Sequence, residues 1–385
     1  MKKPINFIRT IYFFKFFADA LVSGYLSMYF LTFFDKYSYQ YGILLGVIPF
    51  CALIGNFIWG ALSKDVKRNL LLIKIIGSLE LLSLLFFIGL GRNFVTLLIF
   101  TIAISLFNSP VFSFQDGLSS AYAKKDNISF TSIRIMGSLG YLFALASGAG
   151  LIYLFKENFL LIFIISSVIY LMCIILWFFI KPFDNTIESK DTKIKFSQVL
   201  SNKIFLLYFI AYILIISMNN VGDSFLFARL SDKGLSSSGY SLVFASEILL
   251  EVITSFLIIK FVKEQHFLIT LKIATAIILL RLFLFSFNFP LGLLIAFAPL
   301  RGIGWGAFIS LHIIILRKIV SAPLLTKAIT ILAIPVSLFN GLFTIFGPSV
   351  YQQCGLNIFY LILAIICAIG VSLLLFLKPN NLKYK

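Results

Sequence analysis

Residues 112–141 read FSFQDGLSSAYAKKDNISFTSIRIMGSLGY and place a carboxylate, Asp116, and a guanidinium, Arg134, inside otherwise apolar sequence. A short polar loop at 124–126 separates the two charges. If the flanking runs are membrane helices, the charges lie on adjacent antiparallel helices, each about two turns from the loop. A charge at bilayer depth costs roughly 2.5–3.5 kcal/mol, so it is normally paired or faces water. A pairable acid and base in a lipid-soluble chain therefore indicate a polar pathway through it.

The composition of the whole chain is that of a membrane protein. Its 385 residues are 60% hydrophobic and 12% charged, and the mean hydropathy is +1.03. Soluble chains are about 25% charged, so we expect a polytopic protein in a lipid bilayer. The net charge of +17 would suit a nucleic acid partner. However, Lys and Arg recur in short clusters between apolar runs, as a topology signal does, and we expect no nucleic acid partner.

The apolar runs predict an all-α membrane protein with twelve transmembrane helices in two six-helix bundles, because a span needs about 20 mostly apolar residues. The longest polar gap, KPFDNTIESKDTKIKFSQVLSNK at 181–203, divides the runs into two equal sets. We therefore predict an N-terminal bundle at 1–181, a central loop at 182–202, and a C-terminal bundle with a short tail at 203–385. This layout is typical of a transporter built from two repeated bundles. The predicted spans are 8–34, 41–62, 70–91, 94–121, 132–155, 158–180, 203–230, 238–262, 268–287, 290–316, 326–350 and 356–377.

The distribution of Lys and Arg predicts the orientation. Most of those outside the spans fall on the side that holds both termini and the central loop. Positively charged loops remain in the cytoplasm. We therefore expect a multi-pass protein of the bacterial plasma membrane with both termini in the cytoplasm.

Two acids in the first three spans are candidates for function. Asp19 is followed by Ser23 and Ser27 on the same helical face, which predicts that Asp19 faces a cavity and contacts solute or a proton. The alternative is a local pair with Lys15, one turn earlier. Glu80 lies in the middle of the third span and is a candidate coupling carboxylate, although the sequence supplies no partner and a structural acid is an equal alternative.

The seventh span carries a polar face. Asn220, Asp223 and Ser224 share this face by their spacing, and a polar face in a membrane helix must meet protein or water. We assign Asn220 and Asp223 to a solute cavity; interhelical hydrogen bonding is the alternative.

The loop after the second span reads GALSKDVKRN from Gly60. It resembles the loop motif G-x-x-x-D-[RK]-x-G-[RK]-[RK] of the major facilitator superfamily. Lys64 and Asp65 hold the acid and base positions in swapped order. In that family the loop latches neighbouring helices on the cytoplasmic face, and the resemblance implies this gating role for Gly60, Asp65 and Arg68. An ordinary basic loop that fixes topology is the alternative.

Residues 134–141, RIMGSLGY, resemble the R-x-W-G-S-x-G-[FY] signature of a proton symporter subgroup of the same superfamily, which includes nucleoside, phenylpropionate and lactose permeases. Met136 replaces the usual aromatic residue. The resemblance implies that Asp116 and Arg134 bind polar groups of the solute, with Ser138 beside them. A guanidinium and a carboxylate together discriminate hydroxylated or carboxylated solutes. The alternative is a salt bridge that only joins two helices.

The same subgroup has a glutamate in span eight and an arginine in span nine, at about the spacing of Glu251 and Arg281. Glu251 matches that spacing better than Glu247. Arg301 stands where the subgroup has a histidine, and the proton-carrying acid of lactose permease near that point is absent. The resemblance implies proton coupling by Glu251, Arg281 and Arg301, and a structural pair is the alternative.

The predicted function is secondary active transport of a small polar organic solute, of the sugar, nucleoside or aromatic acid class, by alternating access and proton symport. Alternatives are a drug or metabolite exporter and a non-transporting membrane sensor. The drug antiporter motif of span five contains a proline, whereas 134–156 has none. The sequence shows no catalytic motif and no metal-binding spacing of its four cysteines, so we expect no enzyme, cofactor or metal site. We expect a monomer.

Overall fold

The computed structural model describes residues 4–183, 200–320 and 324–378, and their regular secondary structure is helical throughout. The predicted all-α class is therefore confirmed. Most of the predicted central loop, 184–199, lies outside the described residues. Spatial contacts divide the chain into two compact units, Met1–Ser189 with Ser237–Leu242, and Lys190–Ser236 with Val243–Lys385.

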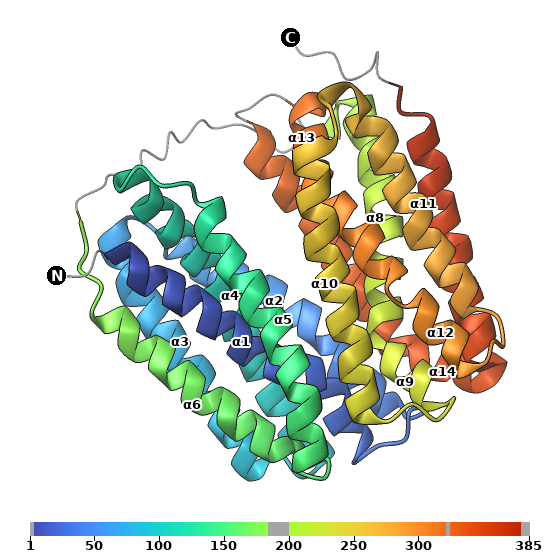
Figure 1. Ribbon diagram of the computed structural model, residues 1–385, viewed down its shortest axis with the longest axis horizontal. Coiled ribbons are helices and arrows are strands. Elements are labelled where there is room, and N and C mark those ends of the chain that lie inside the picture. The colour runs from blue at the N-terminus through green and yellow to red at the C-terminus, as the bar shows by residue number, and fades with distance from the viewer. Residues whose placement is uncertain (1–3, 184–199, 321–323, 379–385) are drawn as a thin grey trace. The chain divides into compact units, whose positions relative to one another are not determined.

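In the first unit, the helices lie side by side in one bundle (Figure 1). Helix α1 packs against α5 and α6, while α4 packs against α2 and α3. Close approach depends on glycine: a Cβ at Gly140 of α5 would lie 2.1 Å from the Phe13 carbonyl oxygen of α1. The helices of this unit are α1 (Pro4–Leu31), α2 (Tyr39–Ala61), α3 (Val66–Leu90), α4 (Phe94–Lys125), α5 (Thr131–Leu154) and α6 (Phe159–Phe178).

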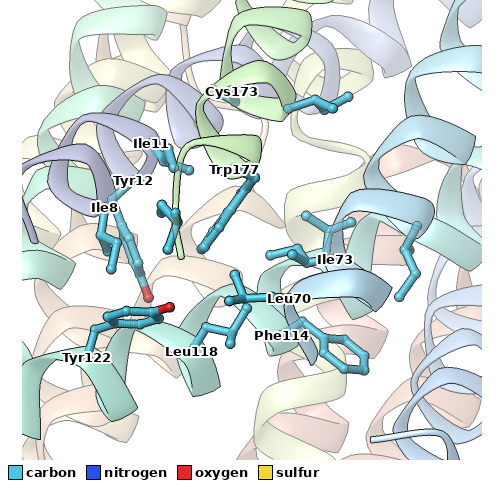
Figure 2. Packing of buried hydrophobic residues seen from close by; sticks show 14 of the residues in the cluster. Ile8, Ile11, Tyr12, Leu70, Ile73, Phe114, Leu118, Tyr122, Cys173 and Trp177 are labelled. Atoms are coloured by element: carbon cyan, nitrogen blue, oxygen red, sulfur yellow. The ribbon is translucent and has the colours of Figure 1, made fainter. Parts of the chain in front are cut away.

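An apolar core fills the end of this bundle nearest to Pro4. Side chains from α1, α3, α4 and α6 meet there (Figure 2). The core fixes the rotation of α1 and α4, and so determines which of their polar residues face each other. The labelled members are Ile8, Ile11, Tyr12, Leu70, Ile73, Phe114, Leu118, Tyr122, Cys173 and Trp177.

The second unit departs from the prediction in two places. The predicted span 203–230 is broken after Ser224, and the predicted span 290–316 is broken at Ala298 and Pro299. Proline has no N–H, so it cannot continue a helix from the preceding turn but suits the start of a new one. The helices are α8 (Lys203–Ser224), α9 (Leu226–Ser231), α10 (Ser237–Phe261), η1 (Glu264–His266), α11 (Phe267–Phe285), α12 (Leu291–Phe297), α13 (Leu300–Ile319) and α14 (Leu325–Leu375).

Ten of the described helices are long and apolar enough to cross a membrane. Helix α14 counts once among them, although its 51 residues are kinked at Gly355, whose φ is 82°. Helix α1 has 28 residues and is not among the ten, and it contains Lys15 and Asp19. If α14 is counted as two spans at this kink and α1 is added, the number of spans agrees with the predicted twelve.

Candidate functional site

A cluster of five charged side chains lies inside the second unit. Arg281 of α11 contacts Asp223 of α8 at 2.5 Å and Glu247 of α10 at 3.3 Å. Arg301 of α13 contacts Glu251 of α10 at 2.7 Å and the second oxygen of Asp223 at 3.1 Å. Asp223 therefore bridges the two guanidinium groups, and the cluster joins four helices.

The helix breaks and Gly302 position this cluster. Asp223 lies one residue before the break that ends α8, and Arg301 lies in the first turn of α13 after Pro299. A Cβ at Gly302 would lie 2.0 Å from the Glu247 carbonyl oxygen, so only glycine lets α13 approach α10 this closely. The close approach at Gly302 therefore places the guanidinium group of Arg301 beside the carboxylates of α10.

The cluster contains more acid than base. If all five side chains were ionised, three carboxylates would face two guanidinium groups. Glu247 is fully buried and Arg281 is 1% exposed. Glu247 Oε2 accepts no hydrogen bond within the described residues, although Arg301 Nε lies 3.9 Å away. A proton on one carboxyl group would balance the charge of the cluster.

The structure pairs these residues differently from the sequence interpretation. Arg281 contacts Glu247 and Asp223, whereas Glu251 contacts Arg301. Glu247 is therefore part of the cluster, although its sequence spacing to Arg281 matched the subgroup less well than that of Glu251. Glu247 and Glu251 lie one turn apart on the same helical face, so spacing alone did not distinguish their partners.

The residues of the polar face predicted on the seventh span lie in two different environments. Asp223 contacts both arginines, and the Asn219 amide also donates to Asp223 at 3.4 Å. Asn220 is half-buried, and its backbone carbonyl accepts a hydrogen bond from Ser224. The structure therefore brings Asp223, but not Asn220, into the charged cluster.

A buried polar network in the first unit contains the other two predicted acids. Lys15 donates to Glu80 at 2.8 Å, and Tyr170 donates to the other oxygen of Glu80. One amide nitrogen of Asn108 donates to both Glu80, at 2.8 Å, and Asp19, at 2.6 Å. Lys15 thus pairs with Glu80 across helices instead of with its neighbour Asp19. The sequence interpretation missed Asn108, whose only signal was an amide within an apolar run.

The Asp116–Arg134 pair lies elsewhere in the same unit. Arg134 Nη1 lies 2.9 Å from Asp116 Oδ2, and the two side chains are 54% and 37% exposed, respectively. Tyr12 donates to the other oxygen of Asp116. Ser138 is half-buried one turn after Arg134 on α5. The pair is therefore accessible to a ligand, unlike the two buried clusters.

The side chain of Gln115, next to Asp116 on α4, is fully buried, and neither its oxygen nor its nitrogen has a hydrogen-bond partner among the described residues. Buried amides normally have partners, often ordered water. Gln115 is therefore a polar residue in this region that the sequence interpretation missed.

The predicted gating loop forms a local structure. Asp65 is the N-cap of α3 and accepts from the Arg68 backbone N–H at 2.7 Å, while Arg68 Nε donates to the Leu62 carbonyl at 2.8 Å. Gly60 is exposed. The described hydrogen bonds of Asp65 and Arg68 thus stabilise the loop itself.

Within the described residues, no group of His, Cys, Asp and Glu has the arrangement of a metal site. The four cysteines are free.

Comparisons with known proteins agree on a family and a fold. The profile of the MFS_1 like family matches residues 6–362. The uncharacterized transporter YwbF of Bacillus subtilis (strain 168) is 22% identical over 382 residues, which cover 96% of this chain and 92% of that protein.

Two solved structures resemble the chain over most of their length. A mutant of the nucleoside transporter NupG matches with a TM-score of 0.79 and 14% identity, over 97% of this chain and 99% of that one. A bacterial homologue of the human lysosomal transporter Spinster, in an inward-facing and occupied conformation, matches with a TM-score of 0.68 and 15% identity, over 96% and 95%. At these sequence identities, the similarity shows a shared fold only.

Proposed function

The chain belongs to the MFS_1 like family and is a multi-pass membrane transporter of the major facilitator type, and from this premise we propose that it moves a small polar organic solute together with protons. The solute class is that of sugars, nucleosides or aromatic acids. Its relatives are transporters, which fits the expectation that it is not an enzyme. Transport would proceed by alternating access of the two halves, 1–181 and 203–378.

The accessible pair of Asp116 and Arg134 is the observation that carries the solute site. Both side chains are more than one third exposed, so the pair contributes little to joining the two helices and is open to a ligand. Arg134 presents several donors and Asp116 presents acceptors, so together they bind hydroxyl or carboxyl groups. Ser138 adds a hydroxyl on the same helix.

The buried cluster of Asp223, Glu247, Glu251, Arg281 and Arg301 is the proposed proton-coupling element. Moving an ionised carboxylate through a dry state is costly, and a proton removes that cost. Since both oxygens of Asp223 contact arginines, we place Asp223 in the coupling cluster instead of the solute site. Glu247 and Glu251 are the two carboxyl groups left to exchange the proton.

Three further proposals concern the cytoplasmic loop, the oligomeric state and the orientation in the membrane. We propose that Gly60, Asp65 and Arg68 contribute to a cytoplasmic latch, and that the protein is a monomer in the bacterial plasma membrane with both termini in the cytoplasm. The exposed, locally ordered loop between α2 and α3 supports a surface role.

A binding screen tests the solute site directly. Purified protein would be challenged with pools of oligosaccharides, nucleosides and aromatic acids, and thermal stabilisation would be measured for each pool. One pool is expected to raise the unfolding temperature of the wild type but not of Arg134→Gln. Equal stabilisation of both proteins would exclude Arg134 from the solute site.

A further inference from the structure

The buried polar network of the first unit contains one base and two acids. Lys15 is 2% exposed and its ammonium group lies 2.8 Å from Glu80 Oε1. The same ammonium group lies against the Phe112 ring at 4.7 Å and the Tyr170 ring at 4.2 Å. The Lys15 ammonium group therefore lies between two aromatic rings and forms an ion pair with Glu80.

Both carboxyl oxygens of Glu80 accept hydrogen bonds. Its Oε1 accepts from Lys15 and Asn108, and its Oε2 accepts from Tyr170. Asp19 accepts one described hydrogen bond, from Asn108 to Oδ1 at 2.6 Å. Among the described residues, Glu80 therefore has three hydrogen-bond donors and Asp19 has one.

The two carboxyl groups are too close to be ionised together at low cost. Because one nitrogen of Asn108 donates to Asp19 at 2.6 Å and to Glu80 at 2.8 Å, the two accepting oxygens lie at most 5.4 Å apart. Like charges at this separation in a partly buried site oppose each other's ionisation. Lys15 acts on both acids, so its single positive charge would face two negative charges if both carboxyl groups were ionised.

The space beside Asp19 limits what can neutralise it. Asp19, Glu80, Asn108 and Ser166 line a cavity of about 20 Å³. This volume holds about one water molecule. A proton, delivered through one water, fits both the space and the missing charge.

We propose that Asp19 is a proton-binding site of the N-terminal half, separate from the charged cluster of the C-terminal half. The charged groups that act on Asp19 are Lys15 of α1 and Glu80 of α3, with the Asn108 amide from α4. Helix α6 contributes Tyr170, and α5 contributes Tyr141, whose hydroxyl lies 3.3 Å from Ser23 Oγ. Each half then holds a carboxyl group that binds a proton.

The use of this proton in transport rests on the proposed function, but its presence on Asp19 does not. Infrared spectroscopy of the full chain in lipid detects a protonated carboxyl group by its C=O stretching band. At neutral pH, Asp19→Asn is expected to lose part of this band. Asp116→Asn is the matched control and is expected to retain it, because Asp116 is 37% exposed and lies 2.9 Å from Arg134.

A labelled wild-type protein keeps the test decisive if Asp19→Asn does not fold. Heavy carbon in the aspartate side-chain carboxyl groups is expected to shift part of the band, whereas the same label in glutamate shifts only the remainder. An unshifted band with labelled aspartate would overturn the proposal. Loss of the aspartate band on addition of Na⁺ at constant pH would also overturn it, by assigning the site to a metal ion.

Discussion

Arg301 Nη1 lies 2.7 Å from Glu251 Oε2, and this ion pair connects the first turn of α13 to α10. The same guanidinium donates from Nε to Asp223 at 3.1 Å. In the permeases that the chain resembles, a histidine occupies this position. Here a permanently charged side chain ties together two carboxylates, so protonation of a carboxylate is the event that changes the charge of the cluster.

Arg301→Gln is expected to destabilise the protein by about 3–5 kcal/mol, because Arg281 alone would remain against three buried or half-buried carboxylates. Thermal unfolding in detergent measures the effect. Arg317→Gln is the control, since Arg317 is exposed near the end of the same helix and its loss is expected to change little. Equal unfolding temperatures for both variants would show that the cluster does not stabilise α13.

Arg134→Lys is expected to weaken solute binding about tenfold or more, because a lysine keeps the charge but loses the paired donors of the guanidinium. The unfolding temperature is expected to change little, since exposed ion pairs contribute about 0–1 kcal/mol. Titration with the solute identified by the screen measures the affinity. Arg92→Lys, at an exposed position outside the pair, provides the control. Unchanged affinity in Arg134→Lys would argue against a bidentate contact with the solute.

Lys15→Met is expected to destabilise the first unit by about 3–5 kcal/mol, because the buried Glu80 would lose its cationic partner. The double variant Lys15→Met, Glu80→Leu is expected to recover most of this loss, since no buried charge then lacks a partner. A double-mutant cycle of thermal stability measures the coupling between the two residues. Additive losses would mean that the 2.8 Å contact is not an energetically coupled pair.

Gly140→Ala is expected to lower stability by about 1–3 kcal/mol or more, because the new methyl group would overlap the Phe13 carbonyl oxygen, at 2.1 Å. Gly150→Ala on the same helix is the matched control, since a Cβ there meets nothing within 4 Å. Helix propensity favours alanine at both positions, so any difference between them reports the packing of α1 on α5. Similar unfolding temperatures would contradict this packing.

The sequence predicted the helical class because apolar composition and span length are properties of each segment alone. It did not predict the breaks after Ser224 and at Pro299, because each predicted span still reads as one mostly apolar run of membrane-spanning length. Pro299 was the available signal for the second break, whereas Ser224 and Phe225 offered none. The kink at Gly355 was anticipated only as a gap between two predicted spans.

The candidate site was less predictable because partners depend on helix rotation and on residues far apart in sequence. Asp116 and Arg134 were identified as a pairable acid and base, since one short loop joins their helices. The partner of Glu80 comes from α1, 65 residues earlier, so no spacing rule could supply it. Asn108 joins Asp19 to Glu80, yet a single amide carries no charge signal in an apolar run.

The central claim is that solute entry is coupled to protons, and solute-triggered acidification tests it most directly. Purified protein would be reconstituted in liposomes loaded with a pH dye, then challenged with the solute pool that binds. The account predicts acidification in the wild type and its loss in Glu251→Gln. Solute uptake without any acidification, from folded wild-type protein, would contradict proton symport.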